Sequence, residues 1–277
     1  MIQKPLATPL ILKKDHPWIK NMVACYVMND YGCKSISDLT QNGHTGIVNA
    51  GTWVYDGFQC NAISQGIILN NTGNKIVNSE QGTIILYVRG LANIVSGTAR
   101  NLFGKYGTGS LGDFAALLGS NNRLYFLLFD TSLHYVAIES TKIPNWQKGT
   151  QIVLQWDRNN IIANADKIVI AIDGKRQVAD YQTRETAWST INIGTSLALG
   201  NDYDNAAIYA NASIQTCYIF NSVLNEKILL NFYQNRYDIF YSQEEIYNQL
   251  LINFSGLLPT LQNNIFGANA FPIGQGV

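Results

Sequence analysis

The sequence predicts an all-β protein folded as a two-sheet antiparallel jelly-roll sandwich. Short segments alternate between polar and apolar residues, and Gly, Asn and Asp punctuate them. The repeated ten-residue helical patterns that βαβ units need are missing from the first part of the chain. With 277 residues, of which 47% are hydrophobic, the chain is long and apolar enough for a sizeable core. Many short strands of this kind favour a sandwich over a small barrel.

The clearest strand is expected at residues 167–173, where Ile168, Ile170 and Ile172 point to one face, the only face expected to be core. Asp173 and Gly174 then form a pair that can adopt positive φ in a tight turn. The chain should return at residues 175–180 as the second strand of a hairpin. Further strands are expected at residues 22–28, 83–89, 124–128, 133–139, 152–156, 191–199 and 213–220.

A short helix is expected near the end of the sandwich, at residues 222–233, where apolar side chains recur at helical spacing. A second helical candidate covers residues 242–254, and a tail rich in Gly, Asn and Pro follows it. These changes divide the chain into an N-terminal arm (1–20), the sandwich (21–240), and a C-terminal helix with an apolar tail (241–277).

Charge is scarce and balanced, with 19 Lys and Arg against 19 Asp and Glu. No basic field is available for nucleic acid, and no apolar run is long enough for a membrane helix. The four cysteines form no CxxC pair, so free thiols are expected instead of a zinc knuckle or a disulfide scaffold. We therefore expect no nucleic acid, no membrane insertion, no metal and no cofactor.

The order of the segments resembles a known superfamily. Met28 and Asn29 end an apolar first strand, as in a V-A-x-W-x-M-N-E pattern. The turn D-x-x-x-N-G-x-x-G is matched by Asp38, Asn42, Gly43 and Gly46. Later pieces follow in the same order, among them TIILYVRG, NLFGKYG, NWQKGTQIVLQWDR and KIVIAIDGKRQVA. Residues 20–240 are in this way similar to laminin G-like, concanavalin A-like lectin/glucanase domains, especially those of bacteriophage virion proteins.

This resemblance implies a non-enzymatic structural protein of a bacteriophage virion, assembled in the host cytoplasm. It would decorate the capsid or belong to the tail or a fibre, and it would display a lectin-like domain with glycans as candidate ligands. The alternative is a free carbohydrate-binding lectin or a glycan-active enzyme on the same fold. The late strand should pair beside the first, which would bring Cys25 and Cys217 near one another as small buried hydrophobes.

Catalytic motifs are not found. Some relatives of this fold are glycosidases with an ExDxxE cluster, because retaining hydrolysis needs two carboxyl groups about 5 Å apart. The glutamates of this chain have no acidic partner at strand spacing. They include Glu80, Glu139, Glu185 and Glu226. GxSxG, HExxH and phosphate-loop motifs are also missing. We therefore expect no enzymatic activity, and structural roles for the isolated His16, His44 and His134.

The candidate ligand-binding residues are Asp202, Tyr203, Asp204 and Asn205, in a polar loop that follows the strand expected at 191–199. The ring of Tyr203 could stack on a sugar while its neighbours bind hydroxyl groups. The two aspartates could instead ligate calcium through oxygen. The plain alternative is a solvated loop that binds nothing.

The segment 246–277 has no Lys, Arg, Asp or Glu, and it carries Leu250, Leu251, Ile252, Phe254, Leu257, Leu258, Ile265, Phe266 and Phe271. Such a segment would be poorly solvated if it were free. It can pack back onto its own sandwich, but we expect it to dock on a neighbouring subunit, because the sandwich is complete near Phe240. Expected partners are other virion proteins, through this tail and the N-terminal arm, a second copy of the chain, and a surface glycan.

Overall fold

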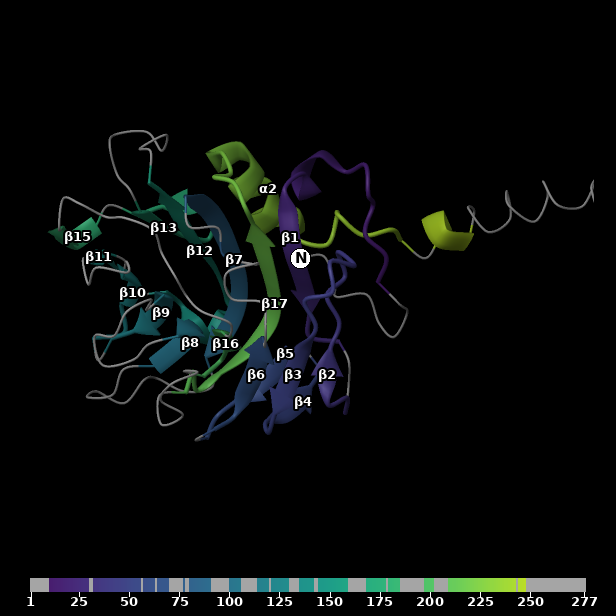
Figure 1. The fold of residues 1–277 in the computed structure, drawn as a ribbon, viewed down its shortest axis with the longest axis horizontal. Coiled ribbons are helices and arrows are strands. Elements are labelled where there is room, and N and C mark those ends of the chain that lie inside the picture. The colour runs from purple at the N-terminus through teal and green to yellow at the C-terminus, as the bar shows by residue number, and fades with distance from the viewer. Residues whose placement is uncertain are drawn as a thin grey trace, which may run out of the picture.

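The computed structural model describes residues 10–29, 32–55, 57–62, 64–69, 77, 80–90, 100–105, 114–119, 121–129, 135–141, 144–158, 168–177, 179–184, 197–201, 209–242 and 244–247. These residues form two antiparallel sheets that face each other, which confirms the predicted all-β sandwich (Figure 1). The candidate loop residues Asp202, Tyr203, Asp204 and Asn205 lie outside the described residues, as do residues 248–277.

One sheet has eight strands. In chain order they are β1 (Met22–Val27), β4 (Thr52–Val54), β5 (Gly57–Cys60), β7 (Gln81–Gly90), β12 (Thr150–Asp157), β13 (Ile168–Ile172), β14 (Lys175–Arg176) and β17 (Ala212–Phe220). The spatial order is β14-β13-β12-β7-β17-β5-β4, and β1 also pairs with β17. The predicted pairing of the late strand beside the first is thus confirmed, with Cys25 opposite Tyr218 and Cys217 opposite Tyr26.

The other sheet has nine strands. They are β2 (Ser35–Ile36), β3 (Gly46–Asn49), β6 (Gly66–Leu69), β8 (Arg100–Lys105), β9 (Phe114–Leu118), β10 (Leu124–Phe129), β11 (Tyr135–Ser140), β15 (Ala179–Arg184) and β16 (Leu197–Leu199). Their order is β15-β11-β10-β9-β8-β16-β6-β3-β2. Every strand predicted from alternation has a counterpart in one of the two sheets, although only 197–199 of the segment expected at 191–199 falls among the described residues.

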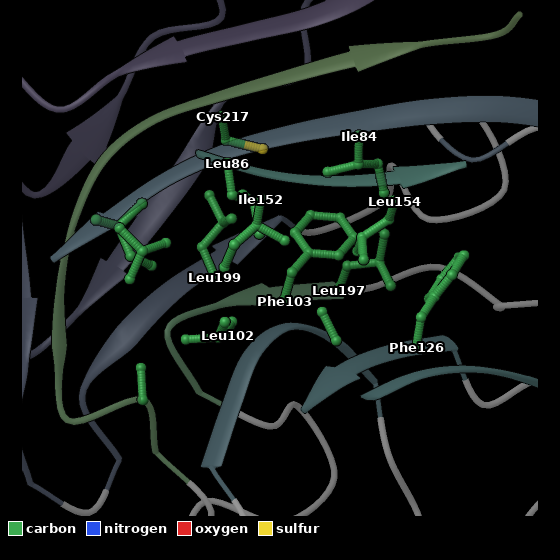
Figure 2. Packing of buried hydrophobic residues seen from close by; sticks show 14 of the residues in the cluster. Ile84, Leu86, Leu102, Phe103, Phe126, Ile152, Leu154, Leu197, Leu199 and Cys217 are labelled. Atoms are coloured by element: carbon green, nitrogen blue, oxygen red, sulfur yellow. The ribbon is translucent and has the colours of Figure 1, made fainter. Parts of the chain in front are cut away.

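The main core fills the space between the sheets. Figure 2 shows Ile84, Leu86, Ile152 and Leu154 of the eight-stranded sheet, with Phe103, Phe126, Leu197 and Leu199 of the nine-stranded sheet. Trp156 is fully buried there, and its ring meets that of Phe114 edge-on with the centroids 5.2 Å apart. Such edge-to-face pairs add to the free energy gained from burying the ring area.

A second apolar cluster covers the outer face of the eight-stranded sheet. Helix α2 (Glu226–Asn235) lies over this face (Figure 1). Leu229 and Phe232 of α2 pack in the cluster together with Leu12 of the N-terminal segment. A 3₁₀ turn, η1 (Pro17–Ile19), contributes to the same cluster, while η2 (Trp146–Lys148) precedes β12. Ala171 of β13 belongs to this outer cluster. The expectation that β13 buries only its isoleucine face is therefore wrong, because α2 covers the other face.

The predicted turn at Asp173 and Gly174 is confirmed, since their φ angles are 52° and 74°. The hairpin that follows is shorter than expected. Only Lys175–Arg176 pair back with β13, whereas Ala179–Arg184 pair with β11 in the other sheet. The returning segment thus crosses between the sheets instead of completing one long hairpin.

The predicted helix at 222–233 begins later than expected, at Glu226, because Asn225 is its N-cap. Asn225 Oδ1 accepts a hydrogen bond from the backbone N–H of Ile228 at 2.9 Å. Near the C-terminus, residues 244–247 form a helical turn. Ser242 and Glu245 cap it reciprocally, because the backbone N–H of each donates to the side chain of the other.

Candidate functional site

The predicted ligand-binding loop can be described only at its two ends. Asn201 and Tyr209 form an antiparallel bridge that brings these ends together. Asn201 is buried, and the guanidinium of Arg100 lies over the Tyr209 ring at 4.7 Å. The loop therefore starts and ends beside β8 and β16 of the nine-stranded sheet. Ligand binding by Asp202, Tyr203, Asp204 and Asn205 stays a prediction.

A polar cluster that the sequence reasoning missed lies on the same sheet. We call Asn121, Arg123, Tyr125 and Glu139 the Glu139 cluster. Asn121 Nδ2 donates hydrogen bonds to Glu139 Oε1 and, at 3.3 Å, to the Tyr125 hydroxyl. Arg123 extends a guanidinium nitrogen to 3.9 Å from Glu139 Oε1. Glu139 is only 8% exposed, so its carboxylate depends on these partners for most of its solvation.

Local sequence explains why these side chains meet. The turn between β9 and β10 closes when the Gly119 N–H donates to the Arg123 carbonyl at 2.9 Å, and Asn122 adopts a φ of 63°. Asn121 Oδ1 accepts from the Arg123 N–H at 3.0 Å, which fixes the amide within the turn. Tyr125 then follows on β10, where the strand register places it directly opposite Glu139 of β11. A tight Asn-rich turn and a regular hairpin are enough to assemble the cluster.

The cluster lies on the outward face of the nine-stranded sheet. Phe126 and Ile138, the next residues along β10 and β11, belong to the core between the sheets. Because side chains alternate along a strand, Tyr125 and Glu139 point away from that core. Leu117 of β9 is paired with Tyr125, and Asn101 of β8 is paired with Leu117. The outward face thus carries a row of neighbouring side chains across four strands. The row runs from the buried Asn101 through Leu117 and Tyr125 to Glu139.

The electrostatics of the cluster favour a protonated tyrosine. Partial burial and the hydrogen bond to Glu139 raise the pKa of Tyr125 above its ordinary value, although the amide of Asn121 opposes the shift. The phenol therefore stays neutral at physiological pH and donates to the carboxylate. Gly119 packs against the Tyr125 ring so closely that a Cβ there would overlap it. The ring is in this way held at the edge of the turn, half-buried.

These groups can recognise a sugar. The Tyr125 ring offers an apolar face, the Glu139 carboxylate accepts hydrogen bonds, and the Arg123 guanidinium donates them, while Asn121 fixes the tyrosine and the carboxylate. Ligand sites typically combine such apolar surface with a few fixed polar groups. In the sequence, Glu139 is distinguished only by the lack of an acidic partner at strand spacing. The alternation of Leu124, Phe126 and Leu128 would have placed Tyr125 on the opposite face, near the Asn-rich turn.

The Asp38 turn, by contrast, has a structural role. Asp38 Oδ1 accepts from the backbone N–H groups of Cys25 and Thr40, each at 3.0 Å, and from the Thr40 hydroxyl at 2.8 Å. This carboxylate fastens the turn to β1. The carbonyl of His44 accepts from the Tyr26 hydroxyl at 2.5 Å, within the same region. His16 caps η1, whereas His134 lies outside the described residues.

Cys25 and Cys217 are both buried free thiols, as expected. Their side chains belong to different clusters, because Cys25 packs in the outer cluster and Cys217 in the core between the sheets. Burial raises the pKa of both thiols. In the part of the chain that the structure describes, no three His, Cys, Asp or Glu side chains converge as a metal site would require. No helix among the described residues has the length and apolarity needed to span a membrane.

The chain matches no protein-family model and no curated protein sequence. Solved structures do resemble it. A Trypanosoma rangeli sialidase in complex with sialic acid matches with a TM-score of 0.59 and 14% identity, over 79% of this chain and 34% of the sialidase. The receptor binding domain of botulinum neurotoxin type G matches with a TM-score of 0.53 and 16% identity, over 78% of this chain and 51% of that domain. The serotype D binding domain matches with a TM-score of 0.56 and 11% identity, over 78% and 52% of the two chains.

This chain therefore spans about one third of the sialidase and about half of the toxin domains. At these identities the likeness shows the fold alone, a β-sandwich consistent with a lectin-like jelly roll. The predicted fold class is confirmed. None of these three structures is a protein of a bacteriophage particle.

The expectation that this protein is not an enzyme is corrected by the same comparison. Sialidases are among the proteins that share the fold, so an enzyme fold is suggested, although not shown at 14% identity. The expectation rested on the missing pair of carboxylates. Sialidases are exceptions to that rule because their nucleophile is a tyrosine. The absence of paired carboxylates in the sequence thus does not exclude action on glycans.

Proposed function

We propose that this protein is a lectin-like, glycan-binding module displayed on a bacteriophage particle. The observation that carries the glycan-binding part is the Glu139 cluster, in which a half-buried tyrosine ring is surrounded by a carboxylate, an amide and a guanidinium. The fold supports it, because the sandwich occurs in a sialidase bound to sialic acid and in toxin receptor binding domains. A sandwich with such a face suits the recognition of cell-surface sugars.

The proposed binding mode uses the geometry of the cluster. A sugar ring stacks on Tyr125, while its hydroxyl groups donate to Glu139, and Asn121 holds the tyrosine and the carboxylate in place through its two donated hydrogen bonds. Arg123 supplies a positive charge at the rim of the cluster, with a guanidinium nitrogen 3.9 Å from Glu139 Oε1. An acidic sugar would gain an ion pair there. The loop residues Asp202, Tyr203, Asp204 and Asn205 are proposed as a second contact.

The particle assignment is supported by the sequence alone. The order of strand and turn segments over residues 20–240 resembles domains of virion proteins, and the uncharged residues 246–277 suit attachment to another protein. The module would then decorate a capsid or form part of a tail or fibre. Mass spectrometry of purified particles, followed by localisation in a cryo-EM map, tests this part. Absence of the protein from the particle would overturn it.

A glycan array probed with the full chain tests the binding part. Tyr125→Ala and Glu139→Gln should each abolish the strongest signals. Tyr55→Ala is the matched control, because Tyr55 is an exposed tyrosine in the turn after β4 of the other sheet. Tyr203→Ala tests the predicted loop in the same experiment, and unchanged binding would remove that loop from the site.

Incubating the best glycan with the protein and measuring released sugar separates binding from turnover. Release that persists on Tyr125→Ala would place an active centre elsewhere. An array without any signal would overturn the proposal.

A further inference from the structure

A groove of about 540 Å³ lies between the N-terminal segment and the Asp38 turn. Its lining includes the apolar side chains of Ile11, Leu12 and Met22 and the exposed amides of Gln41 and Asn42. Leu12 and Met22 are themselves buried, whereas Ile11 is 44% exposed and presents its side chain to solvent at the groove. Uncovered apolar surface of this kind, rimmed by polar groups, marks an interaction site.

The backbone beside the groove has an open edge. Leu12 faces Phe240 in an antiparallel bridge, but the hydrogen bonds of this bridge are made by their neighbours: the Lys13 N–H donates to Ile239 and the Tyr241 N–H donates to Ile11. The N–H and C=O of Leu12 consequently point to the other edge. Among the described residues, none forms a hydrogen bond to either group. An extended peptide could add to this edge as a strand.

The uncharged C-terminal arm, residues 248–277, begins close by. The chain leads into it through Tyr241, bonded to Ile11, and Glu245, whose carboxylate lies 3.1 Å from Lys13 Nζ. Tyr247, the last described residue, is 62% exposed. The described part of the chain therefore ends near the bonded edge of the 10–13 segment, and the open edge lies on the other side of that segment.

We propose that this groove receives the C-terminal arm of a second copy of the chain. A copy's own arm would have to cross over the 10–13 segment to reach the open edge, whereas a neighbour's arm can approach it directly. The arm has no charge to pair with a charged partner, and its apolar side chains and neutral amides suit the apolar and amide residues of the lining. The lining also includes Lys14 and Asp38, and the Asp38 carboxylate is already bound within its turn. Because each copy holds both an arm and a groove, exchange can close symmetrically. The inference rests on the proposed attachment of the arm to another subunit.

Disulfide trapping between two differently marked chains tests the exchange. All chains carry Cys33→Ser, which removes the exposed native thiol. One full-length chain carries Ile11→Cys, and its partner carries a single cysteine in the arm, at Leu251, Leu258 or Phe266. After mixing and mild oxidation, we expect a covalent heterodimer for at least one arm position. Ile47→Cys is the matched control, because Ile47 is an isoleucine on β3 with 49% exposure and lies outside the groove.

A heterodimer with Ile11→Cys and not with Ile47→Cys supports the proposal. Equal yields from the two, or no heterodimer, would overturn it. A further chain carries both Ile11→Cys and the arm cysteine. If its disulfide forms only within a single chain, the proposal is also overturned, because the groove then holds the arm of the same copy.

Sedimentation of the full chain gives an independent readout. Ile11→Lys should weaken self-association about tenfold or more, since one buried apolar contact is lost, while Ile47→Lys should not. Glycan binding measured on the same chains separates the two proposals. If the arm is not exchanged between copies but glycan binding is intact, only the proposal of arm exchange is overturned.

Discussion

Gln155 of β12 and Thr83 of β7 face each other across neighbouring strands, and Gln155 Nε2 donates to Thr83 Oγ1 at 3.2 Å. This pair holds the chain that enters helix α2. The Leu224 N–H donates to Thr83 Oγ1 at 3.1 Å, and the Leu224 carbonyl accepts from Gln155 Nε2 at 2.8 Å. The outer face of the sheet thus binds the helical layer through hydrogen bonds to its main chain as well as through apolar contacts.

Replacing Thr83 by Val should lower the free energy of unfolding by about 1–3 kcal/mol, because the buried N–H of Leu224 and the amide of Gln155 lose their acceptor. Gln155→Leu should have a similar cost. The double variant should lose less than the sum, since the two residues share one network. Urea denaturation measures each value. Thr52→Val is the control, because Thr52 is exposed on β4. A cost no greater than that of the control would contradict the role of this pair.

The turn between β13 and β14 should not tolerate a side chain at Gly174. Gly174 has a φ of 74°, and a Cβ there would lie 3.1 Å from a methyl group of Leu230 on α2. Gly174→Ala should therefore cost about 1–2 kcal/mol from the left-handed backbone alone. Thermal melting checks this. Gly32→Ala is a useful comparison, because Gly32 has the same φ and nothing within 4 Å of its Cβ position. Equal losses would show that the contact with α2 adds nothing.

Only one of the four cysteines should react in the native protein. Cys33 is exposed, whereas Cys25, Cys60 and Cys217 are buried. Burial raises the pKa of these three thiols, so the reactive thiolate is scarce as well as shielded. A thiol-specific chromogenic reagent should show a single fast reaction, and Cys33→Ser should remove it. Fast labelling of a second cysteine would contradict the burial of the thiols on β1, β5 and β17.

Stability should fall at alkaline pH. Burial raises the pKa of Cys25 and of the Tyr218 hydroxyl in the folded state. In the unfolded chain these groups release their protons near their ordinary values, about 8.5 for Cys and about 10 for Tyr. The folded state therefore binds more protons above these values, and the stabilisation present below about pH 8 is lost as the pH rises. Denaturant titrations at several pH values measure the slope. Cys60→Ala should make it shallower, because the pKa of Cys60 is also raised by burial.

The sandwich could be predicted because its strands alternate clearly and its turns carry the residues that positive φ requires. Asp173 and Gly174 are an example, since the sequence pair itself indicates the turn. The burial of the second face of β13, which carries Ala171, could not be predicted, because it depends on where α2 packs. The crossing of Ala179–Arg184 to the other sheet is equally a tertiary choice. The sequence places Asn121 only four residues before Tyr125 and leaves Glu139 distant, and strand register alone brings them together.

Asn121 offers a direct test of the Glu139 cluster through charge. Asn121→Asp keeps an oxygen acceptor for the Arg123 N–H, which closes the turn, but it replaces the amide that donates to Glu139 with a second carboxylate. Two carboxylates at hydrogen-bond distance repel each other, and Glu139 is buried although Asn121 is exposed, so the variant should be destabilised by about 1–3 kcal/mol at pH 7.

Protonating either carboxylate removes this repulsion, and the difference from the parent protein should shrink as the pH falls below about 5. Melting temperatures of both proteins between pH 4 and pH 8 measure the trend. Asn49→Asp on β3 adds the same charge at an exposed position and should show no such recovery. If the stability lost in Asn121→Asp does not change with pH, the Asn121 amide stabilises the turn and its contact with Glu139 contributes nothing.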